Sequence, residues 1–405
     1  MNKEILTEKA KKHLQVLCDE IGERRVGSLQ NRKATSYTKS ELEEIGWLTE
    51  STELNVIDWK TNGASLTCNG KAFEVFSSHY SLGCSAKGEL IAINSIAQLE
   101  KENLESKIVL LYGEIASQQI APKNFPFWNP EEHQHIISLL EKGNPKALIS
   151  ATERDSATAG GVYPFPLFED GDFNIPSVFM KDTEGEKLLA CVGQEIELIS
   201  QAERISETAY NVIAKNEKNN TKKRIVITAH IDTKIGTPGA IDNGTGVTVL
   251  LLLAELLKDY HSNYSVELVV FNGEDYYGAP GQVKFIEQNV DKFSNIYFNI
   301  NIDGAGYNEG ISCFSPFELP EFVQKKFNEL ISDTEEIVEG LPWYQGDHSL
   351  FIQQGVPAIA VSSQMFIENM NCQEITHTPK DNLSIVNYER VAECAIYIAK
   401  LITSL

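Results

Sequence analysis

The chain has 405 residues, a formal net charge of −22 and 42% hydrophobic residues. A chain of this length and hydrophobic content can bury a sizeable core, and we expect it to form two domains. The strong negative charge argues against a nucleic acid or an anionic membrane as a partner, because both would repel the protein.

Two further features bear on the compartment. Residues 1–9 contain no continuous apolar segment and the sequence has no run of eighteen apolar residues, so we expect neither a signal peptide nor a membrane span. The seven cysteines are an odd number, widely scattered and without a Cys-x-x-Cys pair. This pattern is typical of reduced thiols, and we therefore expect a cytoplasmic protein.

The N-terminal part of the chain is predicted to be helical. Apolar residues at helical spacing predict one helix over about residues 4–21. After a loop at residues 22–28, a second helix is predicted over about residues 31–45, ending at Gly46.

The remaining chain changes character twice. Between about residues 62 and 205, short strands alternate with loops rich in proline, phenylalanine and glycine; the strands are predicted at 107–112, 147–150 and 196–199. From residue 209 onwards, strands alternate with helices up to a terminal helix at about 388–402. This alternation predicts an α/β fold with a mostly parallel mixed sheet and helices on both of its faces.

Polar residues follow the predicted strands of this C-terminal part. His230 lies two residues after the hydrophobic strand 224–228, Glu274 and Asp275 follow the strand 266–271, and Asp303 ends the strand 299–303. Open α/β sheets place their chemistry at the carboxyl ends of such strands. Asp242 at the start of a predicted helix and His377 in a late loop complete the set.

Two imidazoles and several carboxylates at separate strand ends are what a pair of zinc-like ions bridged by a carboxylate would need. Each residue also has an ordinary alternative: His230 as a hydrogen-bonded core residue, Asp303 as a solvated strand end, and Asp242 as the N-cap of a helix over residues 243–258. The pair at 274 and 275 would form a turn, which Gly273 makes plausible.

The whole set resembles the M28 zinc peptidases, the family that contains bacterial leucyl aminopeptidases and glutamate carboxypeptidase II. The resemblance covers most of the chain and implies the zinc-exopeptidase fold, of the phosphorylase/hydrolase-like kind. Position by position, it implies that His230, Asp242 and Asp303 hold one zinc and that Asp242, Asp275 and His377 hold a second. It also implies that Asp232 accepts a hydrogen bond from the ring of His230 and that Glu274 is the general base.

One position departs from the family pattern, which usually has two glutamates where this chain has Glu274 and Asp275. Aspartate is shorter by one methylene, so Asp275 must reach its metal from a closer backbone or bind it more weakly. On this reasoning the zinc site with His230 is expected to be the stronger one.

The segment Trp343–Phe351 is similar to a family segment that lines the substrate pocket, with Gly346 in place of serine. By that resemblance His348 contacts the substrate, although it would equally pack or cap the start of a helix. Tyr344 is a candidate donor to the developing oxyanion, with the alternative that it only walls the pocket.

The segment from Ile175 to Phe179 resembles part of a protease-associated (PA) domain. We therefore predict a peptidase domain made of residues 1–61 and 206–405 and a smaller, β-rich PA-like insertion over residues 62–205. The expected function is that of a di-zinc aminopeptidase that acts on short peptides.

Three alternatives stay open from the sequence alone: a carboxypeptidase, a glutaminyl cyclase, and a metal-free binding or scaffold homologue on the same fold. The oligomeric state is also open, with a homo-oligomer among the choices. Neither a phosphate-cradling glycine-rich loop nor a Gly-x-Ser-x-Gly motif occurs, so nucleotide chemistry and serine hydrolysis lack support.

Overall fold

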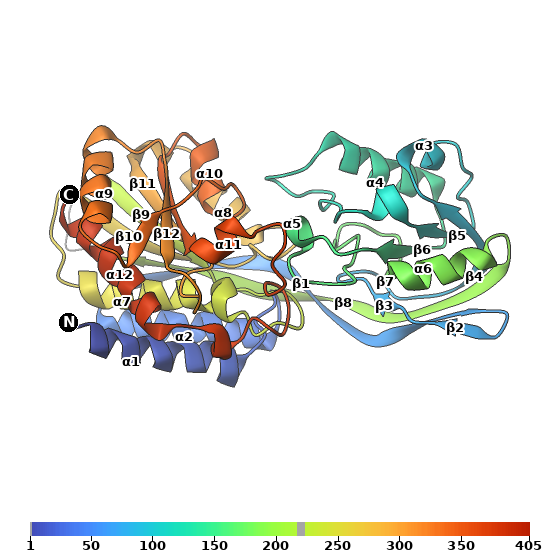
Figure 1. The fold of residues 1–405 in the computed structure, drawn as a ribbon, viewed down its shortest axis with the longest axis horizontal. Helices are drawn as coiled ribbons and strands as arrows, with labels where there is room; N and C mark the ends of the chain where they lie inside the picture. Colours follow the sequence, from blue (N-terminus) through green and yellow to red (C-terminus); the bar gives the residue numbers. More distant parts are fainter. Residues whose placement is uncertain (1, 217–222) are drawn as a thin grey trace. The chain divides into compact units, whose positions relative to one another are not determined.

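The computed structural model describes residues 2–216 and 223–405, which fold as two compact units (Figure 1). The first unit comprises the chain up to Val56 and from Thr208 to Leu405, and the second comprises Ile57–Glu207. The boundaries predicted from the sequence, 61/62 and 205/206, lie a few residues away. Two long strands cross the boundaries: β1 (Leu48–Cys68) and β8 (Glu195–Lys215).

The first unit contains a mixed sheet with the strand order β13-β12-β14-β11-β9-β10-β8. Its strands are β9 (Arg224–His230), β10 (Ser265–Phe271), β11 (Ile296–Ile302), β12 (Ser312–Phe317), β13 (Ile337–Glu339) and β14 (Ala358–Ser363), together with the end of β8. The four central strands β10, β9, β11 and β14 pair in parallel, whereas β8 and β12 pair antiparallel with them. The predicted mostly parallel sheet is confirmed.

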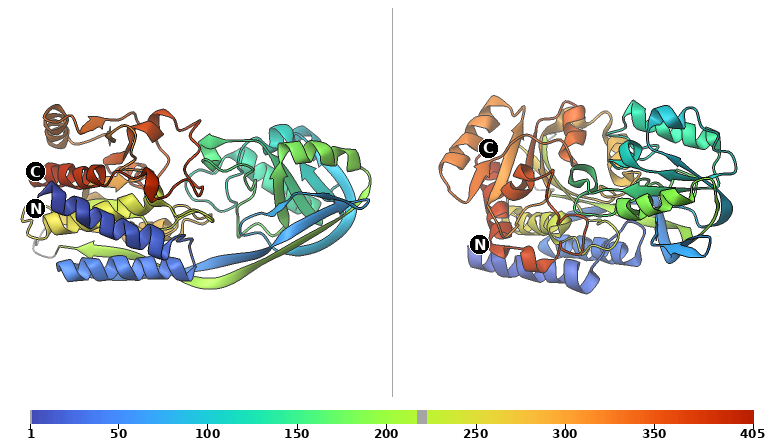
Figure 2. Two further views of the ribbon diagram at one scale, coloured as in Figure 1. Left: turned by 60° about the horizontal axis from the view of Figure 1, so that its bottom comes forward. Right: turned by 45° about the vertical axis from the view of Figure 1, so that its right-hand side comes forward.

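Helices cover both faces of this sheet (Figures 1 and 2). They are α1 (Lys3–Leu14), α2 (Leu29–Ile45), α7 (Thr245–Leu257), α8 (Pro280–Asn289), α9 (Glu321–Ser332), α10 (His348–Gln353), α11 (Gln364–Glu368) and α12 (Tyr388–Thr403). Residues of α1, α2, α7, α9 and α12 share one apolar core with the strands. In contrast, α8 and α10 contact each other through aromatic rings. Phe285 of α8 packs against Phe351 of α10 and against Phe271 at the end of β10.

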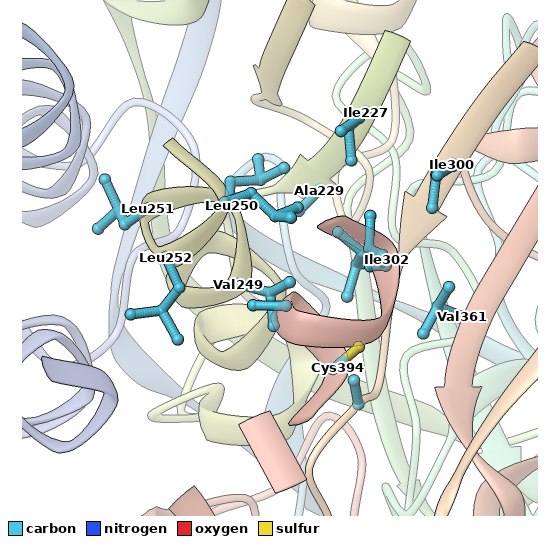
Figure 3. Close-up of a cluster of buried hydrophobic side chains, with 14 of the residues drawn as sticks. Ile227, Ala229, Val249, Leu250, Leu251, Leu252, Ile300, Ile302, Val361 and Cys394 are labelled. Atoms are coloured by element: carbon cyan, nitrogen blue, oxygen red, sulfur yellow. The ribbon is translucent and has the colours of Figure 1, made fainter. Parts of the chain in front are cut away.

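The main core lies between α7 and the central strands (Figure 3). Strand residues such as Ile227, Ile302 and Val361 are fully buried there, as is Leu250 of α7. Parallel strands that are covered on both faces read as continuous apolar runs, which is the pattern of β9. The segment Ala240–Leu257 has the length and hydropathy of a membrane span, but 89% of it is buried within the unit, as expected for a core helix.

The second unit contains a parallel group of strands in the order β4-β5-β6-β7, edged by antiparallel β3 and β8. Its elements are β2 (Lys71–Phe73), β3 (Phe76–Ser77), β4 (Cys84–Ile93), α3 (Ile96–Leu99), β5 (Ile108–Leu111), α4 (Glu131–Gly143), β6 (Ala147–Thr152), α5 (Ser156–Ala159), β7 (Ser177–Lys181) and α6 (Asp182–Leu188). The three strands predicted in this region are present. The similarity of this unit to a PA domain stays a prediction.

The predicted helices are also present, with one correction. The first is α1 continued by a π-helical turn to Ile21, and α2 ends at Gly46, whose φ of +104° places it in the left-handed region that favours glycine. The helix predicted from residue 243 begins only at Thr245, because Asp242 and Asn243 have non-helical backbone angles. The alternative that Asp242 caps this helix is therefore wrong.

His13 makes the stability of the first unit sensitive to pH. Burial lowers its pKa to about 4, with Lys12 and Lys9 adding to the effect, and its Nδ1 lies 2.7 Å from the Tyr37 hydroxyl. Because the unfolded state binds a proton below pH 6.5 while the folded state does so only near pH 4, stability is lost as the pH falls between these values. Lowering the pH from 7 to 5 should therefore cost about 2 kcal/mol through this residue.

Urea denaturation of the wild type and of a His13→Gln variant at both pH values measures this effect. The variant should lose about 2 kcal/mol less than the wild type on acidification, because glutamine does not titrate. An equal loss in both proteins would contradict the assignment.

Candidate metal centre

Three of the candidate ligands lie at the carboxyl ends of neighbouring parallel strands. His230 is the last residue of β9, Asp303 directly follows β11, and Asp275 lies in the turn after β10. Since β9 pairs in parallel with both β10 and β11, these three ends meet at one edge of the sheet. This is the edge where open α/β sheets bind ligands.

The turn after β10 is held by the carboxylate of Asp232. Gly273, at φ +122°, makes the turn that the sequence predicted. The backbone N–H groups of residues 273, 274 and 275 then donate to Asp232 at 2.7, 3.3 and 3.0 Å. These bonds fix the turn, so that Glu274 and Asp275 can point in different directions.

The other two candidate ligands come from irregular segments. Asp242 precedes α7, and His377 lies in the loop before the final helix with a φ of +63°. A positive φ in a residue other than glycine is uncommon and is often found at functional sites. The loop is thus held in an unfavourable conformation that brings the imidazole to the same place as the strand ends.

The two carboxylate oxygens of Asp242 face two different histidines. Oδ1 lies 3.1 Å from Nε2 of His230, and Oδ2 lies 3.2 Å from Nε2 of His377. Asp303 Oδ1 lies 3.6 Å from the first imidazole, and Asp275 Oδ1 lies 3.3 Å from the second. The side chains form two groups that share Asp242, and the ligand atoms within each group lie within 4.8 Å of one another.

These separations fit metal coordination. Two ligands at zinc distances and a tetrahedral angle would lie about 3.3 Å apart, in the middle of the range of 3.1–3.6 Å seen here. Nε2 of His230 is buried and makes no hydrogen bond with the part of the chain that the structure describes, and the same holds for Oδ2 of Asp275. Buried polar atoms normally have partners, so these two atoms point to a missing group.

The electrostatics of the centre agree with a cation. Burial alone would lower the pKa of His230, but the carboxylates of Asp303, Asp232 and Asp242 hold it well above 6.5. His377 behaves in the same way, with Asp275 and Asp242 as its partners. Burial and the repulsion of Asp242 raise the pKa of Asp275. Mutually repelling acids of this kind are stabilised by positive charge between them.

Asp232 differs in detail from the expected acceptor for the ring of His230. Its Oδ1 is 3.6 Å from Nδ1 of His230, which is longer than a hydrogen bond, while its backbone oxygen is 3.2 Å from the same nitrogen. The main task of the Asp232 carboxylate is to hold the turn at residues 273–275. The ring of His230 is bonded instead to the backbone oxygen of Asp232.

Glu274, the predicted general base, lies next to Asp275 on the turn and is only half-buried. Burial raises the pKa of its carboxyl well above 4.5, as do the neighbouring charges of Asp275, Asp303 and Asp347. The structure thus places Glu274 beside the two groups of ligands, with its role still a prediction.

The two residues predicted from the segment after Pro342 are not members of the two groups of ligands. His348 is the first residue of α10, is fully buried and bonds through Nε2 to the backbone oxygen of Trp343 at 2.7 Å. It packs the start of the helix, and its contact with a substrate stays a prediction. Tyr344 is 64% exposed and packs edge-on against Phe317, so its role as an oxyanion donor stays a prediction.

Sequence reasoning missed three buried charged residues near the centre. Asp347 accepts a bond from Gln282 at 2.8 Å, and burial raises its pKa to about 7. Asp381 and Arg24 contact the segment that leads to Asp242. Asp381 follows His377 closely in the sequence, which was the one available signal. Arg24 comes from a distant part of the chain and could be placed only by the fold.

Gly239 tests how tightly the segment before Asp242 is packed. Its φ is +59°, and an added Cβ would lie 2.2 Å from Cγ2 of Thr233 and 2.5 Å from the backbone oxygen of Asp242. Gly236 in the same loop has a φ of +81° and no described atom within 4 Å of such a Cβ. Gly236→Ala should cost about 1–2 kcal/mol from backbone strain, and Gly239→Ala about 1–3 kcal/mol more from overpacking.

Urea denaturation of both variants measures this difference in the free energy of unfolding. Equal losses would show that the segment around Gly239 can move aside.

Comparisons with known proteins agree with this geometry. Residues 211–402 match the family model described as "Peptidase family M28". The chain is 24% identical to aminopeptidase YwaD of Bacillus subtilis over 64% of its own length and 59% of that protein. It is also 24% identical to the probable lipoprotein aminopeptidase LpqL of Mycobacterium tuberculosis, over 70% of its own length and 55% of that protein. The chain thus spans little more than half the length of these two relatives.

Solved structures share the fold. An aminopeptidase from Aneurinibacillus sp. strain AM-1 has a TM-score of 0.75 at 21% identity, with 98% of this chain and 93% of that chain covered. BSAP, a zinc aminopeptidase from Bacillus subtilis, has a TM-score of 0.74 at 19% identity, with 98% and 94% covered. At these identities the likeness shows the fold alone. Together, these comparisons show that residues 211–402 contain a peptidase M28 domain, and that the chain shares the fold of known aminopeptidases.

Proposed function

We propose that the protein is a di-zinc aminopeptidase that removes N-terminal residues from short peptides. The observation that carries the proposal is the carboxylate of Asp242, whose two oxygens face the imidazoles of His230 and His377. A terminal carboxylate completes each side, Asp303 on one and Asp275 on the other. This donor set of imidazoles and carboxylates suits zinc, and the two relatives named above are called aminopeptidases.

Different residues have different roles in the proposed hydrolysis of an amide bond. His230, Asp242 and Asp303 would hold one ion, and Asp242, Asp275 and His377 the other. When bound there, a pair of zinc ions supplies an activated water and polarises the substrate carbonyl. Glu274 takes the proton from the attacking water and returns it to the leaving amine. Asp232 keeps Glu274 in place through its bonds to the backbone of the turn.

Two features support two ions over one. Both groups of ligands are complete, and the distances on the His377 side, 3.2 and 3.3 Å, are as short as those on the His230 side. In a glutaminyl cyclase that binds one zinc, one of the two groups of ligands would hold no metal. A metal-to-protein ratio near two, measured on protein purified without chelator, is the expected result.

The direction of cleavage is tested with a panel of unblocked, N-blocked and C-amidated dipeptides, each with and without a chelator. An aminopeptidase should cleave the unblocked and the C-amidated peptides, reject the N-blocked ones, and lose activity when the metal is removed. Cleavage of N-blocked peptides together with rejection of C-amidated ones would instead indicate a carboxypeptidase. Activity that survives the chelator would count against a metal-dependent reaction.

The role of Glu274 is tested by Glu274→Gln. Glutamine has nearly the same shape but cannot take a proton, so kcat should fall by about 10²–10⁴-fold. Zinc content should not change, because Glu274 is not among the ligands. Glu321→Gln, at the exposed start of α9, is the matched control and should keep full activity. Near-normal turnover of Glu274→Gln with zinc bound would refute the assignment of the base.

A further inference from the structure

The segment Ile231–Asp242 connects the first histidine of the centre to its shared carboxylate. From Ile231 to Gly239 it has neither helix nor strand, so regular backbone pairing does not fix it. The orientation of the Asp242 carboxylate nevertheless depends on this backbone. Other groups must therefore satisfy its polar atoms and hold it, because buried backbone N–H and C=O groups are normally paired.

Arg24 satisfies the carbonyl groups of this segment. Its side chain is fully buried. The guanidinium donates to the backbone oxygens of Ile231 (2.9 Å), Pro238 (2.7 Å) and Gly239 (2.7 Å), and to those of Leu17 and Gly22 (both 3.0 Å). In addition, the backbone N–H of Arg24 donates to the hydroxyl of Thr233 at 2.9 Å. Arg24 thus joins both ends of the loop to the N-terminal part of the chain.

Asp381 satisfies the N–H groups at the end of the same segment. Its carboxylate, also fully buried, accepts from the backbone nitrogens of Ile241 at 2.7 Å and Asp242 at 3.0 Å. Its backbone oxygen accepts from the nitrogen of Ala240 at 3.3 Å. The carbonyl groups of residues 238 and 239 therefore accept hydrogen bonds from Arg24, and the N–H groups of residues 240, 241 and 242 donate to Asp381.

We propose that Arg24 and Asp381 are positioning residues that fix the shared metal ligand Asp242 by clamping the backbone before it. Neither residue is among the metal ligands, and each acts through the backbone. Arg24 also lies outside the matched segment 211–402, so the N-terminal part of the chain is needed to form the metal centre. This inference rests on the proposed metal-dependent function.

The second unit offers matched controls with the same kinds of contact. Arg204 donates to the backbone oxygens of Tyr80, Phe173 and Asp170, as Arg24 does to carbonyls in the first unit. Asp170 is buried and accepts from two backbone N–H groups, of Lys123 and Asp172, as Asp381 does. Arg204→Lys and Asp170→Asn therefore remove equivalent bonds without touching the segment that leads to Asp242.

The experiment compares Arg24→Lys and Asp381→Asn with these two controls in the full chain. Zinc affinity is measured by titrating each metal-free protein against a chromophoric chelator, and thermal unfolding of the metal-free proteins is followed alongside. Both clamp variants should bind zinc about 10–100-fold more weakly, the usual effect of losing groups that orient metal ligands. The controls should keep the zinc affinity of the wild type, whatever stability each of them loses.

Wild-type zinc affinity in both clamp variants would overturn the proposal, as would an equal loss of affinity in the controls. If Arg24→Lys does not fold, Asp381→Asn decides, since asparagine keeps one acceptor oxygen. A wild-type protein that binds two zinc ions but cleaves no peptide would refute the proposed function. The positioning role of Arg24 and Asp381 would still be supported by weaker zinc binding in their variants. Failure of the wild type to bind zinc at all would refute both.

Discussion

The arrangement of the whole centre depends on one carboxylate that serves two sides. Asp242 places one oxygen 3.1 Å from His230 and the other 3.2 Å from His377. Asp275 and Asp303 add further negative charge within the same buried region. Such acids would repel one another strongly without compensation, and two protonated imidazoles compensate only in part. The pair of divalent cations that we propose would resolve this conflict, since it would neutralise the acids and leave the imidazoles free to act as ligands.

The fold brings the ligands together in two ways. His230, Asp275 and Asp303 are positioned by parallel pairing of β9 with β10 and β11, which aligns the strand ends at one edge. The large apolar core between α7 and these strands holds the strands in place. Asp242 and His377 instead come from irregular segments and need individual hydrogen bonds. Asp381 links the two, because it follows His377 in the chain and bonds to the backbone of Asp242.

How much of the centre could be predicted follows from this division. The strand ends are visible in the sequence as apolar runs that stop at a histidine or an acid, so His230, Asp275 and Asp303 could be found. The true start of the helix at Thr245 could not be predicted, because tertiary contacts determine the backbone angles of Asp242 and Asn243. The role of Arg24 could not be predicted either, because its partners are backbone carbonyl groups, which every residue has. The assignment of His348 to the substrate pocket came from the family resemblance alone and stays a prediction.

The short side chain of Asp275 bears on the spacing of the ligands on the His377 side. Aspartate was expected to weaken the His377 side unless the backbone came closer to the metal. The three N–H bonds to Asp232 hold the turn tightly against the end of β9, and Oδ1 of Asp275 lies 3.3 Å from Nε2 of His377. The terminal carboxylate on the other side, Asp303, is 3.6 Å from its imidazole. The spacing between the imidazole and the terminal carboxylate is therefore no wider on the aspartate side than on the other side.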